Sequence, residues 1–211
     1  MSATAENDTG TRSGGPGGRR AGRRPATSRS ELEHIALEMF SEQGFEQTTV
    51  DDIAHAAGIG RRTFFRYYAS KNDVAWGAFD DQLTSMRAVL DAQPRDVPLI
   101  EGIRRAVLEF NRVEPAEQPW HRRRLRLILQ TPALQAHSTL RYAAWRQVVA
   151  DHVAERRGEP ASELVPQTVG HACLGVCLAA YERWLADDSA QLPDLLDRVF
   201  RSLEDGWGSP A

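Results

Sequence analysis

Residues 49–73 read TVDDIAHAAGIGRRTFFRYYASKND, and this stretch decides the fold. Thr49 followed by Asp52 is a capping-box signature that begins a helix, and apolar residues at helical spacing continue until Gly58. After a three-residue turn that contains two glycines, a second helical segment covers residues 61–68. Two short helices joined by such a turn are typical of a helix-turn-helix.

An additional helix is predicted upstream of this pair. Ser30 with Glu33 repeats the capping-box signature, and apolar residues at helical spacing follow until Gly44. Downstream, Ser70 is the expected cap of a longer helix that begins near Lys71. The chain therefore encodes three helices in a row before the rest of the protein begins.

Two aromatic residues of the second short helix define its inner face. Phe64 and Tyr68 lie four residues apart, so both are expected to face a small core that also contains Phe40 and Ile53. The arginines between them are then left on the outer face.

Charge is distributed unevenly along a chain of 211 residues whose formal net charge is only -3. Residues 1–29 carry six arginines against two acids, among many glycines. The four cations of residues 30–75 all fall between Arg61 and Lys71, a run that contains no acid. Lys71 is the only lysine of the chain, so arginine provides every other basic side chain. A basic surface on a mildly acidic protein favours a nucleic-acid partner.

The remainder of the chain predicts helices and no convincing strand. Prolines and glycines separate helical segments at residues 71–91, 98–112, 117–130, 133–157, 163–186 and 194–205. The last has the clearest apolar stripe. We therefore expect an all-α fold in three parts: a flexible arm over 1–27, a helix-turn-helix domain over 28–73 and a C-terminal helical domain over 74–206.

The segment around residues 169–181 is apolar nearly all round, so it must be covered on more than one side. The sequence favours a homodimer formed through residues 163–186 and 194–205, in which Gly170 and Gly175 let the partner approach closely. The alternative is that this segment is the central helix of a monomer.

Several other classes of protein fit the sequence poorly. The apolar stretch from Val169 to Tyr181 contains His171 and is too short for a membrane span, and no apolar segment follows Met1, so a cytoplasmic protein is expected. The two cysteines, Cys173 and Cys177, read as reduced and buried, and His171 projects from another face of the helix, so no metal site is predicted. No catalytic motif is present, and we expect neither a catalytic residue nor a cofactor.

The outer face of residues 61–71 carries the chemistry of DNA recognition. Arginine pairs bidentately with guanine in the major groove, so Arg61, Arg62 and Arg66 are candidates for reading bases. Groups at or near helix starts suit phosphate binding, and the candidates there are Thr49, Thr63 and Lys71. The alternative is a solvated basic face on a helical hairpin.

The segment AAGIGRRTFFRYYASK, following TTVDDIA, resembles the DNA-binding domain of TetR-family transcriptional regulators. The resemblance covers about Ser28 to Asp73 and implies base contacts from the three arginines. It implies phosphate contacts from a second set of residues, namely Thr49, Thr63, Tyr67 and Lys71. Phe65 departs from the pattern, because the family commonly has a tyrosine there whose hydroxyl meets a phosphate.

A narrower resemblance extends over most of the chain. The segments SKNDVAWGAFD, PWHRRRLRLIL and ACLGVCLAAYERWLADD are similar to the regulators that accompany mycofactocin biosynthesis genes. This resemblance implies a homodimeric repressor of a palindromic operator, released by a small molecule, with a long-chain acyl-CoA as the effector.

The C-terminal helices are expected to enclose the apolar cavity that such an effector needs. The candidate lining residues are Phe110, Trp120, Leu125, Ile128, Trp145, Leu174, Val176 and Tyr181. Cations for a CoA head are concentrated at His121, Arg122, Arg123, Arg124 and Arg126. The alternative readings are a solvated helix face for the arginines and plain core packing for the aromatic residues.

Two other functions are alternatives to a transcriptional regulator. One is an all-helical enzyme or small-molecule-binding protein that uses the same cavity. The other is an RNA or membrane-surface binder that uses the arginine-rich arm, whose binding would be lost on deletion of residues 1–27.

Overall fold

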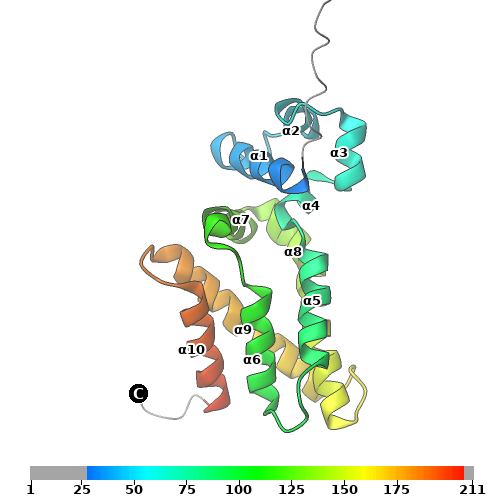
Figure 1. Ribbon diagram of the computed structural model, residues 1–211, viewed down its shortest axis with the longest axis vertical. Helices are drawn as coiled ribbons and strands as arrows, with labels where there is room; N and C mark the ends of the chain where they lie inside the picture. The colour runs from blue at the N-terminus through cyan, green and yellow to red at the C-terminus, as the bar shows by residue number, and fades with distance from the viewer. Residues whose placement is uncertain (1–27, 207–211) are drawn as a thin grey trace, which may run out of the picture.

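The computed structural model describes residues 28–206, and every regular element in that range is a helix (Figure 1). The all-α prediction is confirmed. The predicted arm over residues 1–27 lies outside the described residues. The elements are α1 (Arg29–Glu42), α2 (Val50–Ala56), α3 (Arg61–Tyr67), α4 (Lys71–Trp76), α5 (Phe79–Asp91), α6 (Leu99–Phe110), η1 (Pro115–Glu117), α7 (Gln118–Gln130), α8 (Pro132–Arg157), α9 (Leu164–Ala186) and α10 (Leu192–Glu204).

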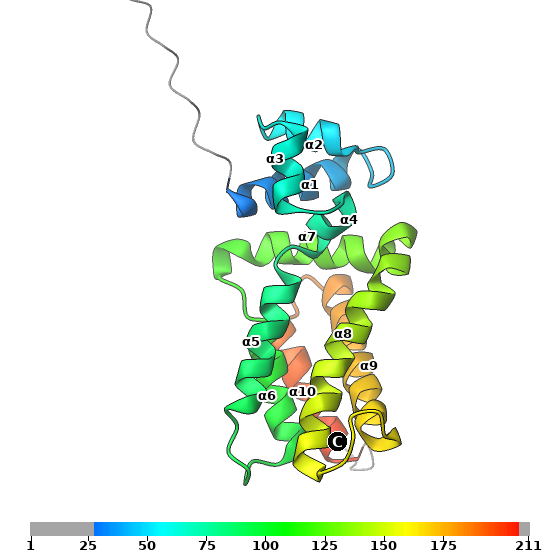
Figure 2. The same cartoon turned by 90° about the vertical axis from the view of Figure 1, so that its right-hand side faces the viewer.

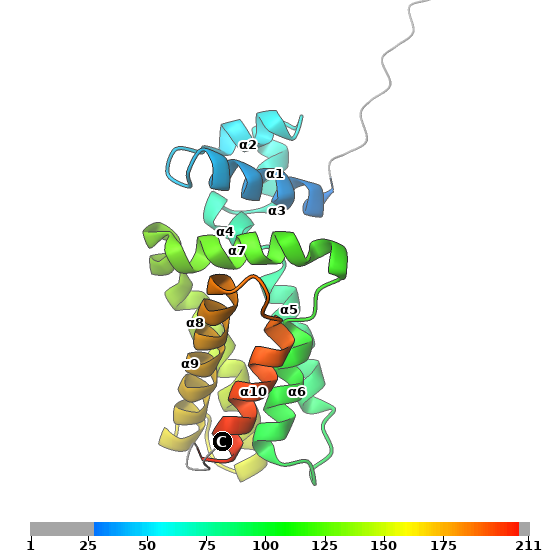
Figure 3. The same cartoon turned by 90° about the vertical axis from the view of Figure 1, so that its left-hand side faces the viewer.

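Two hydrophobic cores give the molecule a small body and a large one. The small body contains α1 to α4, and the large body contains α5 to α10. Leu134 of α8 is buried in the small core and Leu127 of α7 packs against it, so these two helices join the bodies. Helix α7 lies crosswise between the small body and the long helices of the large one (Figures 2 and 3).

The local signals of the small body act largely as predicted. Thr49 caps α2 in a reciprocal capping box with Asp52, and Ser70 caps α4. Phe64 and Tyr68 are buried in one cluster with Phe40 and Ile53, as the four-residue spacing predicts. The turn after α2 directs α3 outward, as a helix-turn-helix requires.

The predicted start of α1 needs one correction. Ser28, rather than Ser30, is the N-cap, and its side chain accepts a hydrogen bond from the Glu31 backbone N–H at 3.0 Å. Two capping signatures overlap in this sequence, and the earlier one is used. Glu33 is therefore free of a capping role and lies buried between the two bodies, 8% exposed.

The predicted single helix over 71–91 is wrong, because the chain breaks it at Gly77. This glycine has φ 57° and ψ -129°, a backbone conformation that side-chain-bearing residues rarely adopt. A Cβ at this position would lie 2.4 Å from Nη1 of Arg124 and 2.8 Å from Oε2 of Glu33. The break at Gly77 therefore also makes room for the junction of the two bodies.

The later helices lie within two residues of their predicted ranges, and α8 and α9 pack side by side along the large body (Figure 2). Gly170 is buried at this contact, since a Cβ there would lie 2.9 Å from the Arg146 carbonyl oxygen. It therefore serves packing within one chain, which corrects the role predicted for it at a partner subunit. A Cβ at Gly175 would meet nothing within 4 Å.

Helix α9 is longer than the apolar run from which it was predicted. Over its 23 residues it has the length and composition of a membrane span, with a mean hydropathy of 1.3 in its most apolar window. The expectation that this segment is too short for a membrane span, which rested on a thirteen-residue stretch, is therefore wrong about its length. In the structure α9 carries Cys173, Cys177 and Tyr181 into the core and packs between α8 and α10.

Candidate DNA-binding surface and internal cavity

Helix α3 lies in the small body, on the side of it that is turned away from α7 and the large body (Figure 1). Arg61, Arg62 and Arg66 are exposed, whereas Phe64 on the opposite face is fully buried. The structure thus brings the three predicted base-reading arginines onto one outer surface. Burial of a single aromatic face fixes how α3 is rotated and therefore which side chains point outward.

Two further contacts shape this surface. The guanidinium of Arg61 donates to Asp51 Oδ2 at 2.6 Å and lies 5.3 Å from the centre of the Phe65 ring. Phe65 is 43% exposed, so its ring lies on the same outer surface as the arginines. Both side chains of the Arg61–Asp51 ion pair are exposed, so breaking it costs little free energy.

The predicted phosphate-binding residues differ in their exposure and in their contacts. Thr49 is exposed, and its hydroxyl donates to Asp52 Oδ2 at 2.6 Å at the start of α2. Thr63 is half-buried in the first turn of α3. Tyr67 is also half-buried and packs against the small core, with the Arg66 guanidinium 5.2 Å from its ring centre.

Lys71, predicted to contact phosphate, is half-buried, and its ammonium is bound by backbone carbonyls. Its ammonium donates to the carbonyl oxygens of Phe45 at 2.8 Å, Thr48 at 3.1 Å and Glu46 at 3.5 Å, and it lies 4.4 Å from the Phe45 ring centre. An ammonium has three donors, and three carbonyls occupy them. Lys71 therefore holds the loop between α1 and α2 that positions Thr49.

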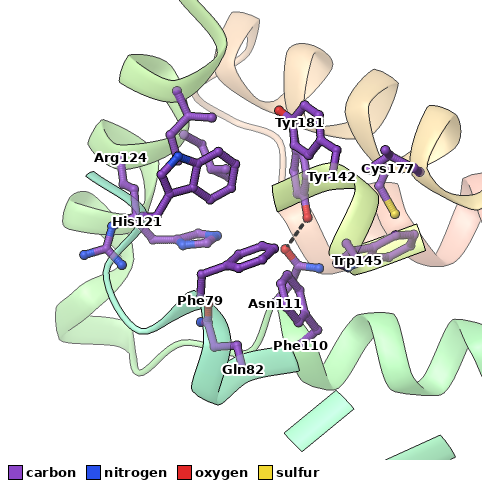
Figure 4. A pocket seen from close by; sticks show the side chains of 14 residues that line it. Phe79, Gln82, Phe110, Asn111, His121, Arg124, Tyr142, Trp145, Cys177 and Tyr181 are labelled. Carbon is purple, nitrogen blue, oxygen red and sulfur yellow. Dashed lines mark hydrogen bonds between the residues drawn. The ribbon is translucent and has the colours of Figure 1, made fainter. Parts of the chain in front are cut away.

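A small, mainly apolar cavity lies in the large body beneath α7 (Figure 4). Eight of the predicted ligand residues line it, and they are Phe110, His121, Arg124, Leu125, Ile128, Trp145, Leu174 and Tyr181. The four from α7 are spaced i, i+3, i+4 and i+7, so one helical face forms this wall. These helices therefore bring the eight residues together around one partly open, mainly apolar space.

Trp120 and Arg122 do not line this cavity, which corrects both assignments. Trp120 stacks on the ring of His34 in α1, with centroids 4.2 Å apart and planes 7° apart. The Arg122 guanidinium donates to the Trp184 carbonyl at 2.6 Å and pairs with Asp188 at 2.7 Å. Both residues lie on other faces of α7, because consecutive residues of a helix are turned about 100° apart.

The other α7 arginines of the predicted CoA-binding set are also outside the cavity. Arg122, Arg123 and Arg126 line an open groove between α1 and α7, together with Phe40 and Thr131. Val176 packs against the large core without lining the cavity. Of the predicted cationic set, only Arg124 and His121 remain at the cavity wall.

Sequence reasoning missed several lining residues. Trp76 ends α4 and Phe79 begins α5, and the break between them at Gly77 turns both toward the cavity. The further residues missed are Gln82, Asn111, Tyr142 and Cys177. Cys177 follows Leu174 and precedes Tyr181 at helical spacing, so the α9 stripe was a usable signal, whereas Asn111 gave none.

Polar groups of the cavity are few and specifically placed. The Tyr181 hydroxyl donates to Asn111 Oδ1 at 2.7 Å across the space, as Figure 4 shows. Asn111 also donates to the Val107 carbonyl at 2.9 Å. Burial raises the pKa of Tyr181 well above its ordinary value, so the hydroxyl stays protonated and keeps donating.

Three cavity-wall nitrogens are buried and lack a hydrogen-bond partner within residues 28–206. They are Nε1 of Trp76, Nε2 of His121 and Nε of Arg124. Burial, helped by the nearby charge of Arg124, lowers the pKa of His121 to about 4, so its ring is neutral at pH 7. Unsatisfied buried polar atoms are costly, which makes this end of the cavity a place for a ligand's polar group.

A second, open cleft adjoins the cavity. It is bounded by Asn111 and His121, which also line the cavity, and it contains Arg105, Arg112 and Gln118. Each of these two arginines is paired with a carboxylate of its own helix, Arg105 with Glu101 at 2.7 Å and Arg112 with Glu109 at 3.2 Å. The apolar cavity thus opens beside a polar cleft whose two arginines are each paired with a carboxylate.

Within the described residues, no group of three His, Cys, Asp or Glu side chains is placed to hold a metal ion. Cys173 and Cys177 are free and buried, and burial raises the pKa of Cys173 to about 12. A thiol with such a pKa stays protonated at neutral pH, and thiols in that state neither bind metal well nor react as nucleophiles.

One ion pair joins the cavity wall to the small body. Arg124 Nη2 lies 2.5 Å from Glu33 Oε2, and Figure 4 shows the guanidinium turned outward from the cavity centre. Glu33 Oε1 accepts a short hydrogen bond from the Tyr68 hydroxyl, and Arg29 Nε donates to that hydroxyl at 3.0 Å. Burial, followed by the bond to Glu33, raises the pKa of Tyr68, so the hydroxyl remains a donor.

Comparison with known proteins gives matches over both bodies. Residues 34–75 match the bacterial regulatory proteins of the tetR family, and residues 97–208 match the MftR C-terminal domain. A Mycobacterium tuberculosis protein assigned as the mycofactocin biosynthesis transcriptional regulator MftR is 46% identical over 86% of this chain and 91% of its own length. The transcriptional regulator TcmR of Streptomyces glaucescens is 37% identical over 74% of this chain and 72% of its own.

Solved structures share the fold at low sequence identity. A regulator of fatty acid degradation from Bacillus halodurans, FadR, has a TM-score of 0.62 at 16% identity and covers 89% of this chain and 100% of its own. Thermus thermophilus FadR, solved with lauroyl-CoA, has a TM-score of 0.56 at 21% identity and covers 87% and 97%. At these identities the likeness concerns the fold.

Proposed function

Because this chain belongs to the TetR family of bacterial regulatory proteins and carries a C-terminal domain of MftR type, we propose that it is a ligand-released repressor linked to mycofactocin genes. It is a DNA-binding transcriptional regulator and no enzyme. Two observations together carry the proposal: α3 has an exposed arginine face, and the large body contains a mainly apolar cavity. Its relatives are bacterial regulators, so we assign it to the cytoplasm, where its DNA lies.

In this proposal α3 enters the major groove of operator DNA. Arg61, Arg62 and Arg66 read base edges, while Thr49, Thr63 and Tyr67 contact phosphates. Lys71 acts through the loop whose carbonyls it binds. Arg66→Ala is expected to relax base preference at one operator position by about 1–3 kcal/mol. An unchanged preference in a binding-site selection would contradict this assignment.

The repressor acts as a homodimer through α9 and α10. Support comes from the outer face of α9, where Leu164 is 78% exposed and Val165 41% exposed, and where Gly175 leaves room for a close partner. A two-fold dimer presents two α3 helices, so the operator is palindromic with half-sites one helical turn, about 34–36 Å, or a multiple of it apart.

Gly175→Leu tests the dimer. A bulky side chain on the proposed contact should produce monomers in sedimentation at concentrations where the unchanged protein is dimeric. Ala88→Leu places the same side chain at an exposed position of α5 and should leave the dimer intact. A Gly175→Leu protein that stays dimeric would refute this interface.

The cavity is proposed to hold the acyl tail of a long-chain acyl-CoA. Its aromatic and aliphatic lining suits an aliphatic chain, and the FadR relative in fold was solved with lauroyl-CoA. We place the polar head in the adjoining cleft, beside Arg105 and Arg112, because that cleft shares Asn111 and His121 with the cavity. The groove of Arg122, Arg123 and Arg126 faces α1 instead.

Release then follows from a shift between two dimer shapes. The effector binds more tightly to the shape in which the two α3 helices no longer match successive major grooves, and only this difference in affinity can move the equilibrium. Helix α7 carries one cavity wall and packs against α1, so it can convey the change.

A mobility-shift assay with the protein's own upstream DNA tests the proposal. We expect a shifted band that palmitoyl-CoA removes and that free CoA leaves unchanged. A band indifferent to palmitoyl-CoA would overturn the effector, and the absence of a band on operator DNA would overturn the repressor.

A further inference from the structure

Arg124 contacts both the cavity and the small body. Its side chain lines the cavity, while its Nη2 lies 2.5 Å from the buried carboxylate of Glu33 in α1. Within residues 28–206, no other cavity-lining side chain forms an ion pair with the small body. Arg124 and Glu33 are both largely buried, with side-chain exposures of 17% and 11%.

Glu33 in turn holds the end of the DNA-reading helix. Its second carboxylate oxygen accepts from the hydroxyl of Tyr68, the residue at the C-terminal cap of α3. Arg29 also donates to that hydroxyl at 3.0 Å and to the Gly77 carbonyl at 3.1 Å. A single carboxylate therefore connects α7, α1 and the end of α3.

Three side-chain nitrogens at this junction have no hydrogen-bond partner among the described residues. Arg124 Nε and Trp76 Nε1 are donors buried without partners among the described residues, and neutral His121 leaves its Nε2 without one as well. Carbonyl and carboxylate oxygens are acceptors, and an oxygen at this end would satisfy donors that hydrocarbon leaves bare.

We propose that Arg124 recognises the carbonyl oxygen of the acyl effector and, by turning toward it, gives up Glu33, which loosens the end of α3. The inference rests on the proposed effector and adds the ligand atom and the residue that reads it. The thioester oxygen of an acyl-CoA and the carboxylate of a free fatty acid share this chemistry.

Competition for one guanidinium makes the two sites antagonistic. The antagonism arises because the guanidinium turns to bring Nε onto the ligand oxygen, so that Nη2 pairs with Glu33 when DNA is bound and leaves it when the effector is bound. The coupling is reciprocal, so the factor by which effector weakens operator binding equals the factor by which operator weakens effector binding. Such factors are about 5–150 for a typical allosteric pair.

The deciding comparison uses two ligands that differ by one oxygen. Palmitoyl-CoA has the thioester carbonyl, and S-hexadecyl-CoA, a thioether, lacks it. Operator affinity is measured by fluorescence anisotropy with each ligand, with palmitate as a third probe that separates a carboxylate from a thioester. Ligand affinity is measured by calorimetry on the same dimeric protein.

In the unchanged protein, palmitoyl-CoA should weaken operator binding at least tenfold more than the thioether does, within the range of coupling factors above. Arg124→Gln should abolish this difference, so that both ligands act alike. Glu33→Gln should tighten palmitoyl-CoA binding, because Arg124 is no longer held by a carboxylate, and should lower the coupling factor toward one.

Arg141→Gln is the matched control. Arg141 also pairs across the junction, with Asp73 at 2.9 Å, but it does not line the cavity. Its removal should leave the difference between the two ligands intact.

The outcomes separate this inference from the proposed function. If Arg124→Gln still distinguishes thioester from thioether as the unchanged protein does, the role of Arg124 is wrong while the effector stands. If the unchanged protein ignores all three ligands, the proposed effector and this inference fail together.

Discussion

Replacing Tyr181 by phenylalanine tests how much the polar pair in the cavity contributes to stability. The substitution removes the hydroxyl that donates to Asn111 Oδ1 at 2.7 Å and changes little else in shape. Asn111 is 5% exposed, so water does not readily replace the lost donor. An acceptor left unsatisfied in the interior costs about 1–3 kcal/mol of the free energy of unfolding. For a chain of this size that lowers the melting temperature by about 2–4 °C for each kcal/mol.

A double substitution separates the pair from the packing around it. Asn111→Leu with Tyr181→Phe removes both partners and leaves an apolar wall, which is expected to recover most of the loss. The Val107 carbonyl keeps its backbone partner, because the Asn111 amide N–H donates to it at 3.1 Å. The measurement is urea unfolding of the unchanged, single and double variants at fixed protein concentration, since a dimer's stability depends on concentration.

The difference in unfolding free energy between the single and double variants shows whether the unpaired Asn111 acceptor causes the loss of stability. A double variant no more stable than Tyr181→Phe alone would refute the reasoning, because the loss would then come from packing and not from an orphaned acceptor. A slope of unfolding free energy against urea that stays constant across the series confirms that the variants unfold from the same compact state.

Four other outcomes are expected. Burial lowers the pKa of His121 from 6.5 to about 4, so between these pH values the folded protein binds fewer protons than the unfolded chain. The free energy of unfolding should therefore fall by up to about 3 kcal/mol as the pH drops through this range. Unfolding of His121→Gln, measured at several pH values, should depend less on pH. Gly170→Ala should lower the melting temperature, because a Cβ only 2.9 Å from the Arg146 carbonyl costs about 1–3 kcal/mol and outweighs a gain of about 1 kcal/mol in helix propensity. Phe65→Tyr should tighten binding to operator and non-operator DNA alike, by about 0.5–1.5 kcal/mol, as a new phosphate contact would; anisotropy titrations with both DNAs check this. Lys71→Met should weaken binding to all sequences alike and also lower the melting temperature, since it releases the carbonyls of the loop before α2.

Local signals made the DNA-binding surface predictable from sequence. A capping box at Thr49 and the Phe64–Tyr68 spacing each act over three or four residues, and together they fix which side of α3 faces outward. The start of α1 was misplaced because two capping signatures overlap, and Ser28 is used instead of Ser30.

The residues that line the cavity were predicted less completely, because neighbouring residues of one helix face different surroundings. Arg122 and Arg124 are two positions apart, and a turn of about 200° sends one to the Trp184 carbonyl and the other to the cavity wall and Glu33. Only the helix packed on each side distinguishes them. Asn111 was missed for a related reason, since its partner Tyr181 is 70 residues away in sequence.

Most of the helices, the helix-turn-helix and its basic face could be predicted from the chain alone, because caps, glycine turns and apolar periodicity are local patterns of a few consecutive residues. The tertiary structure decided which arginine meets the cavity, that Lys71 is bound by carbonyls, and that Gly77 interrupts a helix to admit the Arg124–Glu33 pair. These features depend on contacts between segments distant in sequence, where burial selects one partner among several chemically equivalent side chains.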